Sequence, residues 1–138
     1  MTGGVDLFLD SNVLLYAAGG RVSAPAKHAR AVEVLMMDFG ISSQVLAEFY
    51  INATRKGPTP LAPSAAQEWI GLLSKRPCQP VDAAVVQAGI ALSQRYQTSY
   101  WDGAIIAAAK RLGATTIFSE DLNNGQNYDG VTVVNPFL

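Results

Sequence analysis

The sequence predicts an α/β domain with a parallel sheet and helices on both of its faces. Short apolar runs with the length of buried strands recur along the chain. Between them lie segments of about 10–15 residues in which apolar side chains follow helical spacing. Glycine, proline and small polar residues separate the two kinds of segment. This alternation is typical of sheets whose strands are connected by helices.

Composition indicates one folded domain spanning residues 1–138. Hydrophobic residues make up 49% of the chain and charged residues 15%, which is a globular and not a disordered composition. The formal net charge is −1, so the chain lacks the basic excess of a nonspecific nucleic-acid binder. The low charged fraction leaves apolar surface for a partner or for self-association.

The single cysteine, the single histidine and the hydropathy pattern indicate where the protein is located and which bonds it can form. Cys78 is the one cysteine, so an intramolecular disulfide is excluded and a reducing, cytoplasmic location is expected. His28 is the one histidine and is expected to be a solvated helix residue. No basic segment precedes an apolar run at the N-terminus, and no apolar stretch reaches about 18 residues, so we expect neither a signal peptide nor a membrane span.

The first elements lead directly to an acid. Residues 5–9, VDLFL, are predicted to form a buried strand that Asp10 closes. A short helix over 13–18 follows, with Asn12 as its expected N-cap and Gly19–Gly20 as its end.

The next segments alternate in the same way. Apolar spacing predicts a helix over 26–38, and Ile41 begins a very short strand. Ser42 or Ser43 is expected to cap a helix over 44–56.

A proline-rich loop divides the chain near its middle. Residues 57–63 contain three prolines and are predicted to be irregular. Ser64 and Gln67 have the spacing of a capping box for a helix over 65–76, and a short segment around Cys78 follows.

Two helices and two strands complete the chain. Asp82 is expected to cap a helix over 83–96, and Ser99 to cap a helix over 100–112. The final strands are predicted at 114–118 and 131–134, with a loop between them.

Four carboxylates stand out, although each has a structural explanation of its own. Asp10 and Asp121 follow apolar strands, where ligands collect in parallel sheets, but either could cap a helix or a turn. Glu48 lies inside a helix and could be a rim residue. Asp102 could complete a capping box with Ser99.

Taken together, the four acids favour a metal site. Clustered carboxylates raise one another's pKa unless a cation lies between them. Oxygen ligands suit Mg²⁺ or Mn²⁺, whereas zinc is disfavoured because His28 and Cys78 are single. A divalent ion held by carboxylates lowers the pKa of water and neutralises charge on phosphate, as phosphodiester hydrolysis requires.

These residues also carry a family resemblance that covers essentially the whole chain. The sequence resembles PIN-domain proteins and, more narrowly, VapC-type toxin ribonucleases of bacterial toxin–antitoxin pairs. The matching motifs are Asp10-Ser11-Asn12-Val13-Leu14, Ser43 with Glu48, Trp101-Asp102-Gly103-Ala104-Ile105-Ile106, Ser119-Glu120-Asp121-Leu122 and the closing GVTVVNPF. Ser11 stands where threonine is commoner in that family.

The resemblance implies a three-layer α/β/α sandwich and four catalytic acids, which are Asp10, Glu48, Asp102 and Asp121. In that family the residues matching Asp10, Asp102 and Asp121 hold Mg²⁺ or Mn²⁺, and the residue matching Glu48 orients the attacking water. Asn12 and Ser119 would support the site, whereas Glu120 occupies a variable position. The implied reaction cuts RNA to leave a 5′-phosphate and a 3′-hydroxyl, and the implied partners are an antitoxin and a second copy of the chain.

Three other interpretations remain open at this point. The first is a non-catalytic PIN-like protein that binds RNA or a regulatory partner. The second is an aspartyl-nucleophile phosphatase, which usually needs a second aspartate where Asn12 stands. The third is a Rossmann-like nucleotide-binding module, but no glycine-rich loop follows the first strand.

Overall fold

Helices and strands alternate along the chain as the sequence predicts. The computed structural model describes residues 4–55, 57 and 59–138. The elements in chain order are β1 (Leu7–Leu9), α1 (Ser11–Gly19), α2 (Pro25–Leu35), β2 (Ile41–Ser42), α3 (Ser43–Arg55), α4 (Pro63–Leu73), β3 (Cys78–Gln79), α5 (Ala83–Tyr96), α6 (Tyr100–Arg111), β4 (Thr116–Phe118), β5 (Asn127–Tyr128) and β6 (Val131–Val134). Lys56, the predicted last residue of the third helix, and Pro58 of the predicted loop lie outside the described residues.

The strands form a mostly parallel sheet. One group has the order β1-β4-β6-β5, in which only the pairing of β5 with β6 is antiparallel. A second, parallel pair consists of β2 and β3. A parallel bridge between Phe8 and Gly40 connects the two groups, with Leu9 N donating to Gly40 O at 3.1 Å. The predicted mostly parallel sheet is confirmed.

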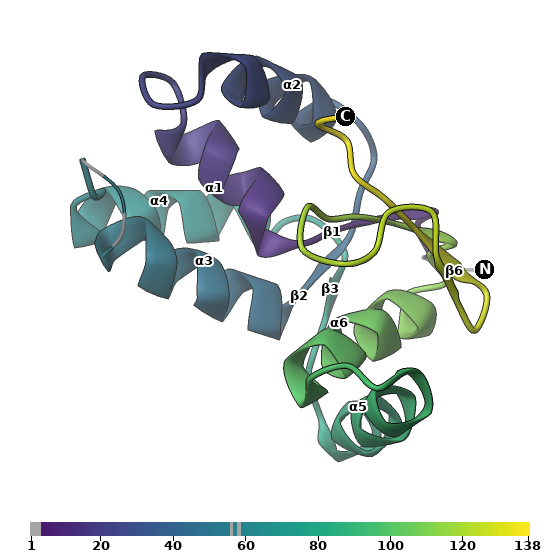
Figure 1. Cartoon of the computed structure of the whole chain (residues 1–138). Coiled ribbons are helices and arrows are strands. Elements are labelled where there is room, and N and C mark those ends of the chain that lie inside the picture. Colours follow the sequence, from purple (N-terminus) through teal and green to yellow (C-terminus); the bar gives the residue numbers. More distant parts are fainter. Residues whose placement is uncertain (1–3, 56, 58) are drawn as a thin grey trace.

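Helices cover the sheet on both sides, which gives the three-layer α/β/α arrangement. Figure 1 shows α1 and α2 on one side of the strands and α5 and α6 on the other. Helix α3 packs against α1 and α4, and α6 contacts strands of both groups. Within the described part of the chain, no helix combines the length and the apolar character that crossing a membrane requires.

A row of apolar side chains fixes the strand register. Phe8, Ile117 and Val133 are paired neighbours on β1, β4 and β6, and each is fully buried. Their register brings the carboxyl ends of β1 and β4 to one edge of the sheet, where Asp10 N donates to Phe118 O at 3.0 Å. Residues that follow these two strands therefore meet at this edge, as is general for parallel sheets.

Small residues bring α6 close to α5. A Cβ atom added to Gly103 would lie 2.3 Å from Gly89 O, and one added to Gly89 would lie 3.0 Å from Ala104 Cα. Neither position has room for a side chain. This close packing holds the first turn of α6, which contains Asp102, against the rest of the domain.

Two predicted helix caps are wrong. Helix α1 begins at Ser11, and its N-cap is Asp10 and not Asn12. Helix α4 begins at Pro63, whose fixed φ suits the first helical turn, so the predicted capping box of Ser64 and Gln67 is not needed and α4 has no side-chain cap.

Other differences concern element ends and one strand. Helix α2 stops at Leu35, three residues before the predicted end. The predicted loop before the last strand contains β5, which turns back onto β6 through Asp129 and Gly130. Both turn residues have positive φ, at 54° and 98°, as a tight hairpin turn requires. Ser42, Asp82 and Ser99 cap the helices that they were predicted to cap.

Candidate active site

Asp10 is a buried carboxylate at the carboxyl end of β1. Only 6% of the residue is exposed. Its Oδ1 accepts from Ser11 N at 2.8 Å, and its Oδ2 accepts from Ser119 Oγ at 2.8 Å. Burial raises the pKa of Asp10 to about 6, although these two hydrogen bonds oppose the rise and the charges of Glu48 and Asp121 add to it. The side chain is therefore harder to ionise than an ordinary aspartate.

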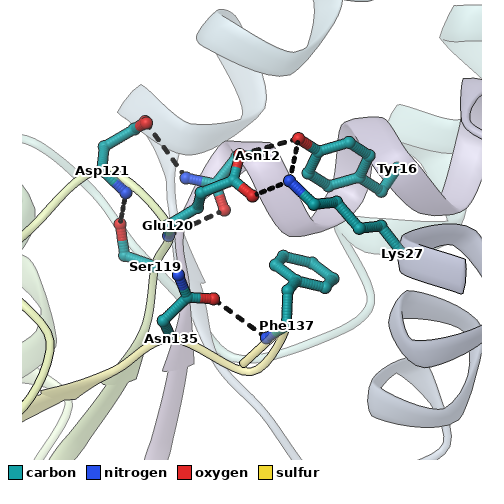
Figure 2. A network of polar contacts seen from close by, with 8 residues as sticks. All are labelled: Asn12, Tyr16, Lys27, Ser119, Glu120, Asp121, Asn135 and Phe137. Atoms are coloured by element: carbon teal, nitrogen blue, oxygen red, sulfur yellow. Dashed lines mark hydrogen bonds and ion pairs between the residues drawn. The ribbon is translucent and has the colours of Figure 1, made fainter. Parts of the chain in front are cut away.

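The turn after β4 places Asp121 beside Asp10. Ser119 Oγ accepts from Asp121 N at 3.1 Å while it donates to Asp10, so one hydroxyl joins both strand ends. Asn12 Nδ2 donates to Asp121 Oδ2 at 3.1 Å, and Asn12 Oδ1 accepts from Glu120 N at 3.3 Å. Figure 2 shows the contacts that Ser119 and Asn12 make with Glu120 and Asp121. Because Asp10 caps α1, the Asn12 side chain is available for this turn.

Glu48 approaches the same region from α3. Its Oε1 accepts from Ser11 Oγ at 3.4 Å, and its Oε2 accepts from Gln44 Nε2 at 3.3 Å. Burial raises the pKa of Glu48, these two hydrogen bonds oppose the rise, and the charges of Asp102 and Asp121 add to it. Both bonds are long for contacts to a carboxylate, so this side chain is held less firmly than Asp10.

Asp102 lies in the first turn of α6. Its backbone N donates to Ser99 Oγ at 3.1 Å, which is half of the capping box that the sequence allowed. The hydrogen bonds of the described residues include no return bond from the Ser99 amide to the Asp102 carboxylate. Burial raises the pKa of Asp102, a side-chain hydrogen bond with Ser99 opposes the rise, and the charge of Asp121 adds to it. The Asp102 carboxylate therefore contacts the cap residue Ser99 without completing the capping box among the described residues.

The four acids interact electrostatically and have no cationic partner among the described residues. The negative charge of Asp121 raises the pKa of each of the other three acids. The salt bridges within the described part of the chain involve two other acids, Glu120 and Asp129. The repulsion among the four carboxylates is therefore not balanced by any described side chain.

The donor chemistry suits a hard divalent cation. All four side chains offer carboxylate oxygens, the ligands that Mg²⁺ and Mn²⁺ prefer. Across residues 4–55, 57 and 59–138, however, no three acidic, histidine or cysteine side chains lie close enough together to hold one ion as they stand. The set therefore fits such an ion by chemistry and charge, and at least one carboxylate would have to move to share it.

An apolar cleft of about 490 Å³ opens beside Glu48. Gln44, Ile51 and Trp101 contribute to its walls, and the indole-bearing residue Trp101 is 61% exposed. Trp101 therefore lies at the surface beside Glu48 and is not a core residue. Gln44 connects α3 with α6 at this cleft, because its Nε2 donates to Trp101 O at 3.1 Å as well as to Glu48.

Sequence reasoning missed two groups that contact the site. Gln44 supports Glu48, and its position one helical turn earlier was a signal that could have been used. Lys27 pairs with Glu120 across 93 positions in the chain, with Nζ 2.5 Å from Oε2. No local pattern in the sequence indicates a contact of that kind.

Comparison with known proteins identifies the family. The PIN domain family matches residues 7–126, which is most of the chain. No curated protein matches the sequence significantly.

Several solved structures share the fold. A toxin–antitoxin complex from Klebsiella pneumoniae has a TM-score of 0.68 and 20% identity, covering 94% of this chain and 97% of that one. VapC20 of Mycobacterium tuberculosis, described as a toxin that cleaves the sarcin–ricin loop, has a TM-score of 0.66 and 18% identity, covering 83% and 91%. VapBC2 from Rickettsia felis, bound to a DNA fragment from its promoter, has a TM-score of 0.62 and 17% identity, covering 92% and 96%. The expected similarity to VapC-type toxins is thus confirmed, and the chain belongs to the PIN domain family.

Proposed function

We propose that this chain, as one PIN-like domain over residues 1–138, is a Mg²⁺- or Mn²⁺-dependent endoribonuclease and the toxin of a toxin–antitoxin pair. One observation carries the proposal. Four carboxylates from separate parts of the chain interact electrostatically at the carboxyl ends of β1 and β4, without a described cationic side chain to balance them. A stable fold that keeps this repulsion is best explained by a cation that binds there.

Each acid has a distinct role in this proposal. Asp10, Asp102 and Asp121 would hold the ion, which when bound supplies Lewis acidity for water and for the phosphate. Glu48 would orient the attacking water and accept its proton, because its raised pKa lies closer to neutrality than that of an ordinary glutamate. Ser119 and Asn12 would orient the carboxylates of Asp10 and Asp121 through their hydrogen bonds.

The comparisons support the substrate and the partners. VapC20 is described as a toxin that cleaves the sarcin–ricin loop, and other solved structures with this fold are toxin–antitoxin complexes. We infer by analogy that the present chain cuts RNA in the cytoplasm, leaving a 5′-phosphate and a 3′-hydroxyl. We further infer that it is inhibited by a cognate antitoxin and that it functions as a homodimer.

A second candidate is a non-catalytic PIN-like protein that binds RNA or a regulatory partner. The spacing of the acids favours it, because no three of the described metal-binding side chains form a group ready to hold one ion. In that case the carboxylates would keep their separation, and a divalent cation would not draw them together.

RNA cleavage distinguishes the two candidates. Total bacterial RNA is incubated with the protein in Mn²⁺ or in EDTA, and new 5′-phosphate ends are mapped by sequencing. The enzyme should produce ends at a few defined positions only with Mn²⁺. Asp10→Asn and Asp121→Asn should remove them, whereas Glu68→Gln, an exposed acid on α4, should not. Ends that persist in EDTA or in both acid variants would contradict the proposed activity. The absence of new ends in the Mn²⁺ reaction would contradict it as well.

A further inference from the structure

Lys27, on α2, contacts polar and aromatic side chains beside the turn that carries Asp121. Its Nζ is 2.5 Å from Glu120 Oε2 and 3.2 Å from Tyr16 Oη, and Tyr16 Oη donates to Glu120 Oε1 at 2.7 Å. Figure 2 shows the three groups converging, with α2 on one side and the turn after β4 on the other. Both carboxylate oxygens of Glu120 are therefore engaged by elements outside its own turn.

Aromatic rings restrict where the Lys27 ammonium can lie. It is 4.9 Å from the ring centre of Tyr16 and 5.8 Å from that of Phe137, distances at which a cation is attracted to a ring. The two rings pack edge to face at 5.0 Å, and Phe137 N donates to Asn135 Oδ1 at 2.9 Å, which fixes the C-terminal segment. The side chains of Lys27 and Glu120 are 41% and 26% exposed, so the ion pair is partly open to solvent while the two rings restrict its position.

The electrostatics match this geometry. The hydrogen bond to Glu120 raises the pKa of Lys27. Burial alone would raise the pKa of Glu120, but the bonds from Lys27 and Tyr16 outweigh it and the pKa is lowered. Lys27 and Glu120 therefore favour each other's charged forms, whereas burial opposes ionisation of Asp10, Glu48 and Asp102.

A short covalent and hydrogen-bonded path connects this ion pair to the acid site. Glu120 and Asp121 are adjacent in the chain. Glu120 N donates to Asn12 Oδ1 at 3.3 Å, and Asn12 Nδ2 donates to Asp121 Oδ2 at 3.1 Å. Holding the Glu120 side chain toward α2 fixes the peptide whose N–H orients Asn12, and Asn12 in turn orients Asp121.

We propose that Lys27 is a positioning residue which, through Glu120 and Asn12, holds the Asp121 carboxylate in place for cation binding. The inference rests on the proposed function, because it assigns Asp121 to the metal. It extends that function to a residue on α2, a helix that contributes none of the four acids.

Loss of the Lys27 charge has opposite consequences under the two possible roles of the ion pair. If Lys27 positions the turn, Lys27→Met loosens Asp121 and weakens Mn²⁺ binding. If Lys27 only neutralises Glu120, the same change releases an extra negative charge near the site and strengthens Mn²⁺ binding. The direction of the change in affinity therefore decides between them.

The test measures Mn²⁺ affinity and amide hydrogen exchange in wild type and variants. Lys27→Met should weaken Mn²⁺ binding about tenfold, the lower end of the effect of removing groups that orient metal ligands. Lys27→Arg, which keeps the charge, should recover most of the affinity. Lys110→Met is the matched control, because Lys110 forms a comparable ion pair with Asp129 away from the acids, at 2.7 Å.

Amide exchange makes the test independent of the metal. In metal-free Lys27→Met, the amides of Glu120 and Asp121 should exchange faster, and in Lys110→Met they should not.

Glu120→Gln should weaken Mn²⁺ binding as Lys27→Met does, and the double variant of Lys27→Met with Glu120→Gln should bind Mn²⁺ no more weakly than either single variant. Unchanged exchange at both amides, or unchanged or stronger Mn²⁺ binding in Lys27→Met, would overturn the inference. Wild type that binds no Mn²⁺ would instead refute the proposed function, and exchange alone would then decide whether Lys27 holds the turn.

Discussion

The strand-end half of the acid site is held much more firmly than its helix half. The strand-end half consists of Asp10 and Asp121. Ser119 Oγ donates to the Asp10 carboxylate at 2.8 Å and accepts from the Asp121 amide at 3.1 Å, and Asn12 donates to the Asp121 carboxylate at 3.1 Å. The helix half consists of Glu48 and Asp102. Glu48 accepts only long bonds of 3.3 and 3.4 Å and lies beside an open apolar cleft. The positions of Asp10 and Asp121 are set by the register of the sheet. The positions of Glu48 and Asp102 are set by the packing of α3 and α6.

This difference explains why the acids are electrostatically linked without forming a ready group of three. Strand ends bring two carboxylates to one edge of the sheet, and hydrogen bonds fix them there. The Glu48 carboxylate accepts only long hydrogen bonds, so we expect a bound cation to restrict its rotamers. We infer that the strand-end half is preformed and that the helix half completes the site when a cation binds.

The largest effect is expected at Asp10, and it depends on pH. Asp10→Asn removes a carboxyl whose folded-state pKa, about 6, lies above its usual 3.8. A raised folded pKa means that the folded state prefers the protonated form. Stability from this group is thus fully present below about pH 4 and is lost as pH rises through about 6. The shift corresponds to at most about 3 kcal/mol.

Urea unfolding of metal-free protein checks this prediction. The unfolding free energy of Asp10→Asn minus that of wild type should increase by up to about 3 kcal/mol between roughly pH 4 and pH 8. A difference that stays constant across this range would show that Asp10 ionises freely. The strand-end half would then be no more constrained than the helix half.

The next largest effect is expected at Ser119, which is fully buried. Ser119→Ala removes the donor to Asp10 and the acceptor for the amides of Asp121 and Leu122. Leaving a buried carboxylate with one fewer partner should lower the unfolding free energy by about 2 kcal/mol at neutral pH. Ser119→Thr keeps the hydroxyl and serves as the control. Equal losses in both variants would mean that packing, and not the hydrogen bonds, holds the two strand ends together.

A smaller effect is expected in the helix half, at Gln44. Gln44→Met removes the bonds to Glu48 and to Trp101 O, but it also removes a buried Oε1 that has no hydrogen-bond partner. These contributions oppose each other, so the unfolding free energy should change by less than about 1 kcal/mol. Mn²⁺ binding should nevertheless weaken, because Glu48 loses a support. A loss of stability as large as that of Ser119→Ala would contradict the view that the helix half is loosely held.

Sequence reasoning predicted the fold where local patterns and tertiary structure agree. Short apolar runs such as LFL and TIF became β1 and β4, and alternation with helices predicted their parallel pairing. Strand β5 was missed, although Asp129-Gly130 is a recognised hairpin signal, because its two residues carry no strand pattern. Helix α2 was predicted too long because apolar residues continue past Leu35, but Met36 and Met37 are exposed and do not extend the buried face of the helix.

The four acids of the candidate site could be predicted from the sequence, but the residues that hydrogen-bond to them and to their neighbours could not. Acids at strand ends can be inferred from sequence because parallel strands place their carboxyl ends together. The choice of Asp10 over Asn12 as helix cap could not be inferred, since both residues are good caps. Contacts such as that of Lys27 with Glu120 join segments 93 positions apart, and only the packed structure determines them.

The most direct test of the account is the melting temperature of wild type and Asp102→Asn, each with and without millimolar Mn²⁺. Without metal, the variant should be slightly more stable, by well under 1 kcal/mol because Asp102 is only half buried and solvent screens it. Mn²⁺ should raise the melting temperature of wild type and leave that of the variant nearly unchanged. Equal responses in the two proteins, or no response in either, would show that the four acids do not form one cation site.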